Sequence, residues 1–345
     1  MAIKSIYGDS VRNAIHKKLQ TVGEISSNGG FAVYASDIEI TKNIGNVSWK
    51  NSIYELATTL SFETAKTDNA YLKDLIYTPK LGEVIRIVTN IEVFRGIIIT
   101  VDDGDRYKNK YTAVDLGWSL NKTSQTYQFK DISVGNAIRE ICSDLSVPID
   151  SIAELSTTVT QIYFDKTVSD IIKDLLSKQG GDYNYDFTPK GLRIYKIGDL
   201  VAYPEFRLAS NLAQCYSPNF RGDVSHSESI EEMKNAIKIV SEKDNVYKEI
   251  MVLQNNDLID EFGLLQKVIK IDPEKENADS VANSELWWNG RIKESYGFEI
   301  IEKYDSYTRA GEVIYVDDVQ YVIESTDHRL SNGWHFNKLE LRKCI

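Results

Sequence analysis

The sequence predicts a mainly β protein with an α+β insert, in which two related tube-like β-barrel domains flank a small α+β domain. Three observations predict this fold class. Residues 82–87, Gly-Glu-Val-Ile-Arg-Ile, return 229 positions later at 311–316 as Gly-Glu-Val-Ile-Tyr-Val. Short runs of β-branched and aromatic residues surround both copies, and such residues favour strands. Between the copies, apolar residues recur at helical spacing. One β module therefore occurs twice, with a different domain between its copies.

The first tube-like β-barrel domain is predicted at residues 1–125. Its strands are expected at 31–40, 47–63, 84–88, 93–101 and 111–116. A half-open barrel of about five or six strands is the simplest closure, because closure hides edges that would otherwise pair with other chains. The first thirty residues fall outside this pattern and have no assigned role.

The small α+β insert is predicted at residues 126–203. Ser133 can cap a first helix, and Thr167 forms a capping box with Asp170 for a second one that a Gly-Gly pair ends. Each helix follows a short aromatic strand, and a hairpin within residues 182–197 follows the second helix.

The second tube-like β-barrel domain is predicted at residues 204–345. It is expected to contain a hairpin at 235–253, a strand at 263–272, a helix at 278–295 and a strand at 297–304 before the repeated module begins. The second barrel is therefore interrupted by one helix.

Composition excludes several classes of protein. With 345 residues the chain can hold two or three domains, and its net charge of −11 argues against gripping nucleic acid through phosphates. The apolar runs are far shorter than the roughly 18 to 20 residues that a membrane span needs. The N-terminus lacks the apolar core of a signal peptide, so we expect synthesis and folding in the cytoplasm.

The cysteines predict neither disulfides nor a metal site, and the aromatic residues indicate contacts with other proteins. Cys142, Cys215 and Cys344 are odd in number and far apart, which fits neither a disulfide framework nor a metal site. The 20 tyrosines and 5 tryptophans are residue types that enrich protein interfaces.

No catalytic, cofactor or metal site is expected. The dinucleotide, P-loop, hydrolase-elbow and zincin motifs are missing, so the chain is predicted not to be an enzyme. His328 and His335 could hold a metal, but two histidines across a turn are more often structural. Carboxylate pairs such as Glu228 with Glu231 are more typical of solvated faces than of a glycosidase.

Several segments together resemble the baseplate hub proteins of contractile phage tails and of phage-tail-like (R-type) bacteriocins, the late control D or tail hub family. The resemblance covers most of the chain after residue 30 and depends on pattern and order. Its segments are 47–49, 60–62, 94–98 and 111–116 in the first half, and 262–266, 311–316, 321–323, 327–328 and 339–341 in the second.

The resemblance implies a structural hub without enzymatic activity. Such a hub trimerises between the tail tube and the spike, so that three chains with two barrels each meet a sixfold tube ring and a threefold spike. The implied partners are two further copies of the chain, the tail tube protein ring, a trimeric spike protein, baseplate wedge proteins and a tape-measure protein. An acidic lumen would let DNA or the tape measure slide. The insert resembles a LysM-like fold, and the particle would leave the host cell.

The contact surfaces of such a hub are predicted on the strands of the two barrels and on the helix of the second. The candidate interface residues are Phe94, Arg95, Trp287, Trp288, Tyr315 and Tyr321. Two alternatives remain open at this point. One is a tail-associated protein that binds or hydrolyses peptidoglycan, and the other is a sugar-binding β protein unrelated to tails.

Overall fold

The computed structural model describes residues 30–69, 76–180, 183–202, 220–243, 246–273, 277–302, 307–316, 319–331 and 334–344. The predicted fold class is confirmed, because the described chain is mainly β with an α+β insert. Cys215 lies outside the described residues.

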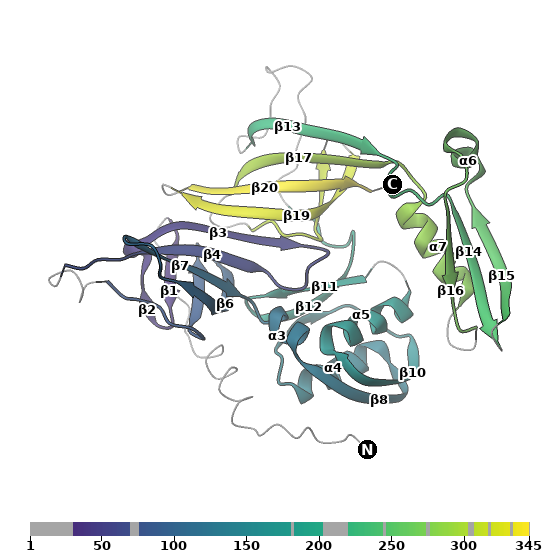
Figure 1. Ribbon diagram of the computed structural model, residues 1–345, viewed down its shortest axis with the longest axis horizontal. Coiled ribbons are helices and arrows are strands. Elements are labelled where there is room, and N and C mark those ends of the chain that lie inside the picture. Colours follow the sequence, from purple (N-terminus) through teal and green to yellow (C-terminus); the bar gives the residue numbers. More distant parts are fainter. Residues whose placement is uncertain are drawn as a thin grey trace.

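Two five-strand modules dominate the molecule (Figure 1). The first consists of β3 (Ile44–Ser52), β4 (Thr59–Ala65), β5 (Val84–Val88), β6 (Glu92–Asp102) and β7 (Lys108–Val114). The second consists of β13 (Phe220–Ser229), β17 (Lys293–Glu302), β18 (Val313–Val316), β19 (Val319–Ser331) and β20 (Trp334–Lys343).

The strand order is the same in both modules. It is β3-β4-β7-β6-β5 in the first and β13-β17-β20-β19 with β18 beside β19 in the second. Even the irregularities agree, since a bulge between Ile98 and Thr100 in β6 matches one between Ile323 and Ser325 in β19. The sequence repeat therefore reflects a repeat of the whole five-strand unit.

The two modules share one 12-stranded sheet. β19 pairs antiparallel with β3, from Ser325 opposite Ser52 to Leu330 opposite Val47. Beyond β5, the sheet continues into β1 (Ala32–Ala35) and β2 (Ile38–Glu39), which precede the short helix η1 (Thr41–Asn43). Each module has an apolar core of its own, around Trp49 in the first and Phe298 in the second.

The α+β insert begins after β7. Its elements are α3 (Gly117–Lys122), β8 (Ser124–Ser133), α4 (Val134–Asp144), β9 (Ile149–Ile152), β10 (Thr158–Thr167), α5 (Val168–Gln179), β11 (Tyr183–Thr188) and β12 (Gly191–Lys196). Both predicted caps are confirmed: the Ser133 hydroxyl accepts from the Asn136 N–H at 3.3 Å, and the Thr167 hydroxyl accepts from the Asp170 N–H at 3.2 Å. The LysM-like character of the insert stays a prediction.

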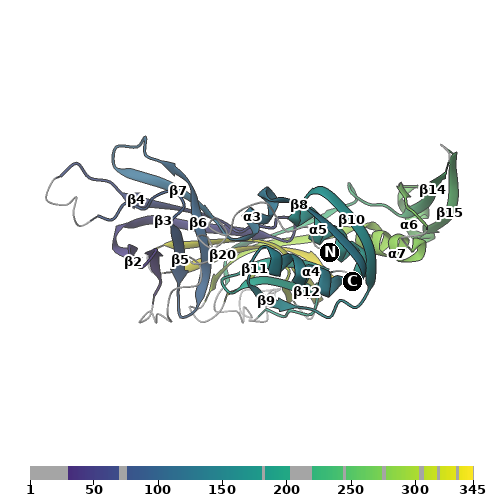
Figure 2. The same ribbon diagram turned by 90° about the horizontal axis from the view of Figure 1, so that it is seen from below.

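A small lobe interrupts the second module between β13 and β17. It contains β14 (Ala236–Lys243), β15 (Val246–Gln254), α6 (Asn256–Phe262), β16 (Gln266–Lys270) and α7 (Ala278–Asn289). Its three strands form a separate sheet, which Figure 2 places at the opposite end of the molecule from the β4 and β7 ends.

The helix predicted at 278–295 was too long. α7 ends at Asn289, where the Gly290 N–H donates to the Leu286 carbonyl at 2.7 Å and caps the last turn. The chain then enters β17, which begins at Lys293 opposite Ser229. β13, α3 and α6 were not predicted at all.

Candidate functional site

The repeated Gly-Glu sequence forms a tight turn at the start of the third strand of each module. In the first module the Gly82 N–H donates to the Ile98 carbonyl at 2.8 Å, and the Ile98 N–H donates back to the Glu83 carbonyl at 2.9 Å. The Glu83 carboxylate accepts from the Lys80 N–H at 2.7 Å. Gly82 has a φ of 75°, a left-handed conformation that favours glycine.

The second module repeats each of these contacts. The Gly311 N–H donates to the Ile323 carbonyl at 2.8 Å, and the Ile323 N–H donates to the Glu312 carbonyl at 2.8 Å. The Glu312 carboxylate accepts from the Arg309 N–H at 3.0 Å, and Gly311 has a φ of 87°. The duplication therefore extends to single hydrogen bonds.

The surroundings of the two turns differ. Leu81 is 65% exposed, whereas its counterpart Ala310 is 2% exposed. Space beside Gly82 is open, but the Tyr195 ring of β12 packs directly on Gly311. The insert thus covers the second copy of the turn, whereas no described residue packs beside Gly82 in the first copy.

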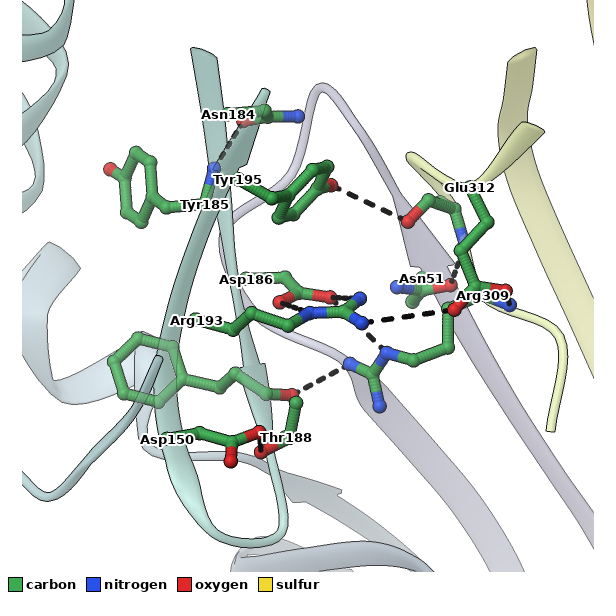
Figure 3. Close-up of polar contacts among 12 residues, drawn as sticks. Asn51, Asp150, Asn184, Tyr185, Asp186, Thr188, Arg193, Tyr195, Arg309 and Glu312 are labelled. Carbon is green, nitrogen blue, oxygen red and sulfur yellow. Dashed lines mark hydrogen bonds and ion pairs between the residues drawn. The ribbon is translucent and has the colours of Figure 1, made fainter. Parts of the chain in front are cut away.

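A buried ionic junction holds the insert on the second turn (Figure 3). Within the β11–β12 hairpin, the Arg193 guanidinium binds Asp186 through two hydrogen bonds of 2.9 and 2.7 Å. Arg309 donates to the same carboxylate at 3.1 Å and to the Phe187 carbonyl at 2.7 Å. Glu312 completes the junction with an oxygen 3.7 Å from Arg193, so two cations face two carboxylates.

The first module also contacts the junction. The Asn51 side-chain oxygen on β3 accepts from the Ala310 N–H at 3.0 Å and from the Thr326 hydroxyl at 2.6 Å. The Asn184 amide on β11 donates to the Ile53 carbonyl at 3.1 Å. These contacts join the insert, the first module and the second module at one place.

Burial and ion pairing act against each other within the junction. Burial alone would lower the pKa of Arg309, but Asp186 and neighbouring groups raise that pKa above its ordinary value. Burial raises the pKa of Glu312, and Arg193 and Arg309 partly offset the increase. Nearby, burial raises the pKa of Asp115 to about 7, although the Thr58 and Gly117 N–H groups bind its carboxylate. All four charged groups of the junction are paired with one another, which is the arrangement of a structural clamp.

The two histidines singled out in the sequence meet where the modules join. His328 Nδ1 and His335 Nε2 lie 2.9 Å apart, and the His328 ring stacks on Trp49 with centroids 4.8 Å apart. The Trp49 indole N–H donates to the Tyr307 hydroxyl at 2.9 Å. Burial lowers the pKa of His335 to about 4. Burial, with smaller contributions from His335 and Arg309, also lowers the pKa of His328 well below its usual value. Both rings are therefore neutral at pH 7.

Two of the candidate interface residues are core residues of the protomer. Phe94 is 2% exposed and Tyr321 is 4% exposed, and they belong to the cores of the first and second modules. Arg95 is half-buried, and its Nε lies 2.6 Å from Glu92. These side chains are packed within the protomer, so any role in contacts between chains stays a prediction.

Two of the other three candidates are exposed, and Trp288 is partly buried. Tyr315 is 38% exposed and Trp287 is 37% exposed. The rings of Trp287 and Trp288 lie edge to face at 84°, so they form no flat platform for a sugar. Arg342 of β20 stacks over Trp288 at 4.3 Å, which ties the lobe to the second module.

One face of the large sheet is polar from β17 to β6. Ser48, Ser61 and Thr112 lie opposite one another across neighbouring strands, and ion pairs such as Lys50 with Asp327 at 2.8 Å lie beside them. The basic side chains on this face include Lys50, Lys108, Lys110, Arg329 and Lys338, and the acidic ones include Glu63, Asp102, Glu299, Asp327 and Glu340. Charges of both signs are therefore interspersed on this face.

The described residues contain no group of three His, Cys, Asp or Glu arranged to hold a metal ion. Among them, no helix is both long and apolar enough to cross a membrane.

Solved structures of tail proteins share this fold. A tail protein from Neisseria meningitidis has a TM-score of 0.69 at 12% identity, with 91% of this chain and 96% of that chain covered. The 43 kDa tail protein of prophage MuSo2 from Shewanella oneidensis has a TM-score of 0.67 at 11% identity, with 90% and 97% covered. An E. coli type VI secretion component, described as similar to the phage T4 tail proteins gp27 and gp5, has a TM-score of 0.54 at 8% identity, with 87% and 73% covered.

Comparison by sequence identifies a family but no individual relative. No curated protein matches the chain. The model of the YQBQ-like family matches residues 47–342, which span both modules, the insert and the lobe. The chain is therefore a member of the YQBQ-like family.

Proposed function

We propose that the protein is a structural baseplate hub of a contractile injection tail, which trimerises to adapt a sixfold tail tube to a threefold spike. The observation that carries this proposal is the duplicated five-strand module, joined edge to edge within one chain. Three such chains contain six similar modules, so one ring can have approximate sixfold and true threefold symmetry at once.

The proposed partners follow from this symmetry and from the fold shared with tail proteins. They are the tail tube ring, a trimeric spike protein and baseplate wedge proteins, with a tape-measure protein passing through. We infer that the polar face of the large sheet lines the channel. Its interspersed charges of both signs would let a polymer pass without binding, so no specific nucleic-acid contact is expected. The hub would be made in the host cytoplasm and released within the particle.

The direct test is the native mass of the purified chain by light scattering, alone and mixed with the candidate spike protein. A species of three times 39.2 kDa, alone or with spike, is expected. A monomer under both conditions would contradict the hub.

A second candidate function is peptidoglycan binding by the insert. Residues of β10 and α5 line a cavity of about 370 Å³, and beside it Ile162 is 64% and Phe164 is 78% exposed. An exposed aromatic ring beside a polar hollow suits a sugar. Cosedimentation with purified peptidoglycan that is lost on Phe164→Ala would support this function, and zymography would reveal any hydrolysis.

A further inference from the structure

We propose that the outer edge of β13 in one protomer pairs antiparallel with the end of β6 in the next, with Ser227 opposite Asp102. This inference rests on the trimer of the proposed function and specifies the contact that closes it. Its partner is a second copy of the same chain.

The pairing of β19 with β3 provides the template. It joins the fourth strand of the second module to the first strand of the first module through six residue pairs. With the modules exchanged, the equivalent strands are β6, the fourth strand of the first module, and β13, the first strand of the second module. Within the described residues, β13 pairs only with β17, and the outer edge of β6 after Ile98 has no backbone partner. The molecule thus carries both halves of a second joint of the same kind.

The register on β6 follows from the shared bulge. Ile323 and Ser325 flank the bulge in β19, and Ile98 and Thr100 flank it in β6, a constant offset of 225 positions. Asp327, which lies opposite Lys50 in the existing joint, therefore corresponds to Asp102.

The register on β13 follows through the neighbouring strands. Thr100 lies opposite Thr112, and its equivalent Ser325 lies opposite Glu340, so Glu340 is the equivalent of Thr112. Ser61 lies opposite Thr112 in the first module, and Gly297 lies opposite Glu340 in the second. Ser48 pairs with Ser61, and Ser225 pairs with Gly297. Ser48 to Lys50 therefore correspond to Ser225 to Ser227.

The side chains of β13 are more exposed than their counterparts on β3, as expected for a strand at an open edge of the sheet. Trp49 and Val47 on β3 are both 0% exposed. Their counterparts on β13 are more accessible, since the His226 side chain is 42% exposed and Val224 is 37% exposed. In the proposed register, Asp103 and Asp105 in the turn that follows β6 would lie opposite His226 and Val224.

The proposed joint is shorter than its template. β6 ends at Asp102, whereas β19 continues to Ser331, so fewer backbone pairs are available. The acidic turn after Asp102 would carry Asp103 toward His226, which already lies 3.6 Å from Glu294 and stacks on Tyr296. A short contact of this kind suits subunits that assemble after folding.

Engineered cysteines test the register. Directly opposite residues of an antiparallel pair have Cα atoms about 4.5 to 5.5 Å apart, within the range that a disulfide bridges. The test variant is Ser227→Cys with Asp102→Cys. A variant shifted by two residues, Ser225→Cys with Asp102→Cys, checks the register. Lys50→Cys with Asp327→Cys is the positive control, because its disulfide should form within one chain and show that oxidation is complete. All variants carry Cys215→Ser and Cys344→Ser.

The full chain, with spike protein if the trimer requires it, is oxidised and run on a non-reducing gel. The expected result is a covalent trimer for the test variant and at least a tenfold weaker band for the shifted one. A trimeric native mass without this crosslink, or with crosslinking only in the shifted variant, would overturn the proposed joint and leave the hub intact. A monomeric mass would remove both proposals.

Discussion

At the scale of single residues, the two copies of the Gly-Glu turn provide a matched comparison. Gly82 and Gly311 have similar left-handed φ angles, but only Gly311 lies under the Tyr195 ring. Alanine at either position incurs the backbone cost of a left-handed residue, about 1 kcal/mol. At Gly311 the new methyl group would also overlap the Tyr195 hydroxyl.

We therefore expect Gly311→Ala to lower the free energy of unfolding by about 3 kcal/mol and Gly82→Ala by about 1 kcal/mol, since overpacking typically adds 1 to 3 kcal/mol. Urea unfolding followed by fluorescence measures both. Equal losses in the two variants would show that the insert does not pack on the second turn as described.

The buried histidine pair predicts an acid-sensitive joint between the modules. The pKa of His335 is about 4 in the fold against 6.5 in the unfolded chain, so the unfolded chain takes up protons first as the pH falls. The contribution of His335 to the free energy of unfolding is therefore complete above pH 6.5 and is lost progressively as the pH falls toward 4. At 1.36 kcal/mol per pKa unit, the free energy of unfolding lost through His335 alone by pH 4 is about 3 kcal/mol.

We expect the variant His328→Gln with His335→Gln to lose less stability than the wild type between pH 7 and pH 4, as measured by urea unfolding at each pH. Asp115, whose pKa is raised to about 7, acts in the opposite direction, but it is present in both proteins and cancels in the comparison. Parallel pH profiles would disprove the role of the pair.

At the scale of elements, the ionic junction clamps the β11–β12 hairpin to the second module. Arg309 is buried and paired, and removing one partner of a buried ion pair costs about 3 to 5 kcal/mol. Arg329 offers a matched control. Each arginine stacks on an aromatic ring at 5.0 Å, but the Arg329 side chain is 52% exposed in its pair with Glu299.

Arg309→Met should therefore lower the free energy of unfolding by about 4 kcal/mol. Arg329→Met should lower it by less than about 1 kcal/mol, because exposed ion pairs contribute little. Chemical unfolding of the two variants provides the measurement. If the variants were equally stable, the junction would not hold the insert.

How far the sequence could predict these elements depended on burial. α4 and α5 each have a buried stripe at helical spacing, and their positions followed from that spacing. β5 is buried at all five positions, and its run of β-branched residues predicted it. β13 escaped prediction because its described side chains are all exposed and, apart from Val224, polar, so no alternation marks it. α6 is only seven residues long and has no buried residue.

The candidate site was predictable only in part. The repeated Gly-Glu turn was visible because its residues are adjacent in the sequence. The ion pair of Asp186 with Arg309 was not, because 123 positions separate the two residues and only the fold brings them together. A buried charge has no local sequence pattern that distinguishes it from a surface charge.

At the scale of the whole molecule, both additions to the module pair enter at strand ends and leave the shared sheet continuous. The insert follows the last strand of the first module, and the lobe lies between the first two strands of the second. The corresponding connection in the first module is short, since β3 and β4 are separated only by residues 53–58. The first module therefore shows how the second would look without its lobe.

This comparison predicts that the lobe can be removed. By the register of the two modules, Ser229 corresponds to Ser52 and Lys293 to Ala57, so residues 53–56 can replace residues 230–292. The lobe has its own core around Ile237 and Ile239, and its excision leaves the core of the second module intact. We expect the shortened chain to retain its strand signal by circular dichroism and to form the same trimer by light scattering. Loss of both would mean that the lobe is part of the folding unit, and loss of the trimer alone would place a subunit contact on the lobe, where Trp287 is exposed.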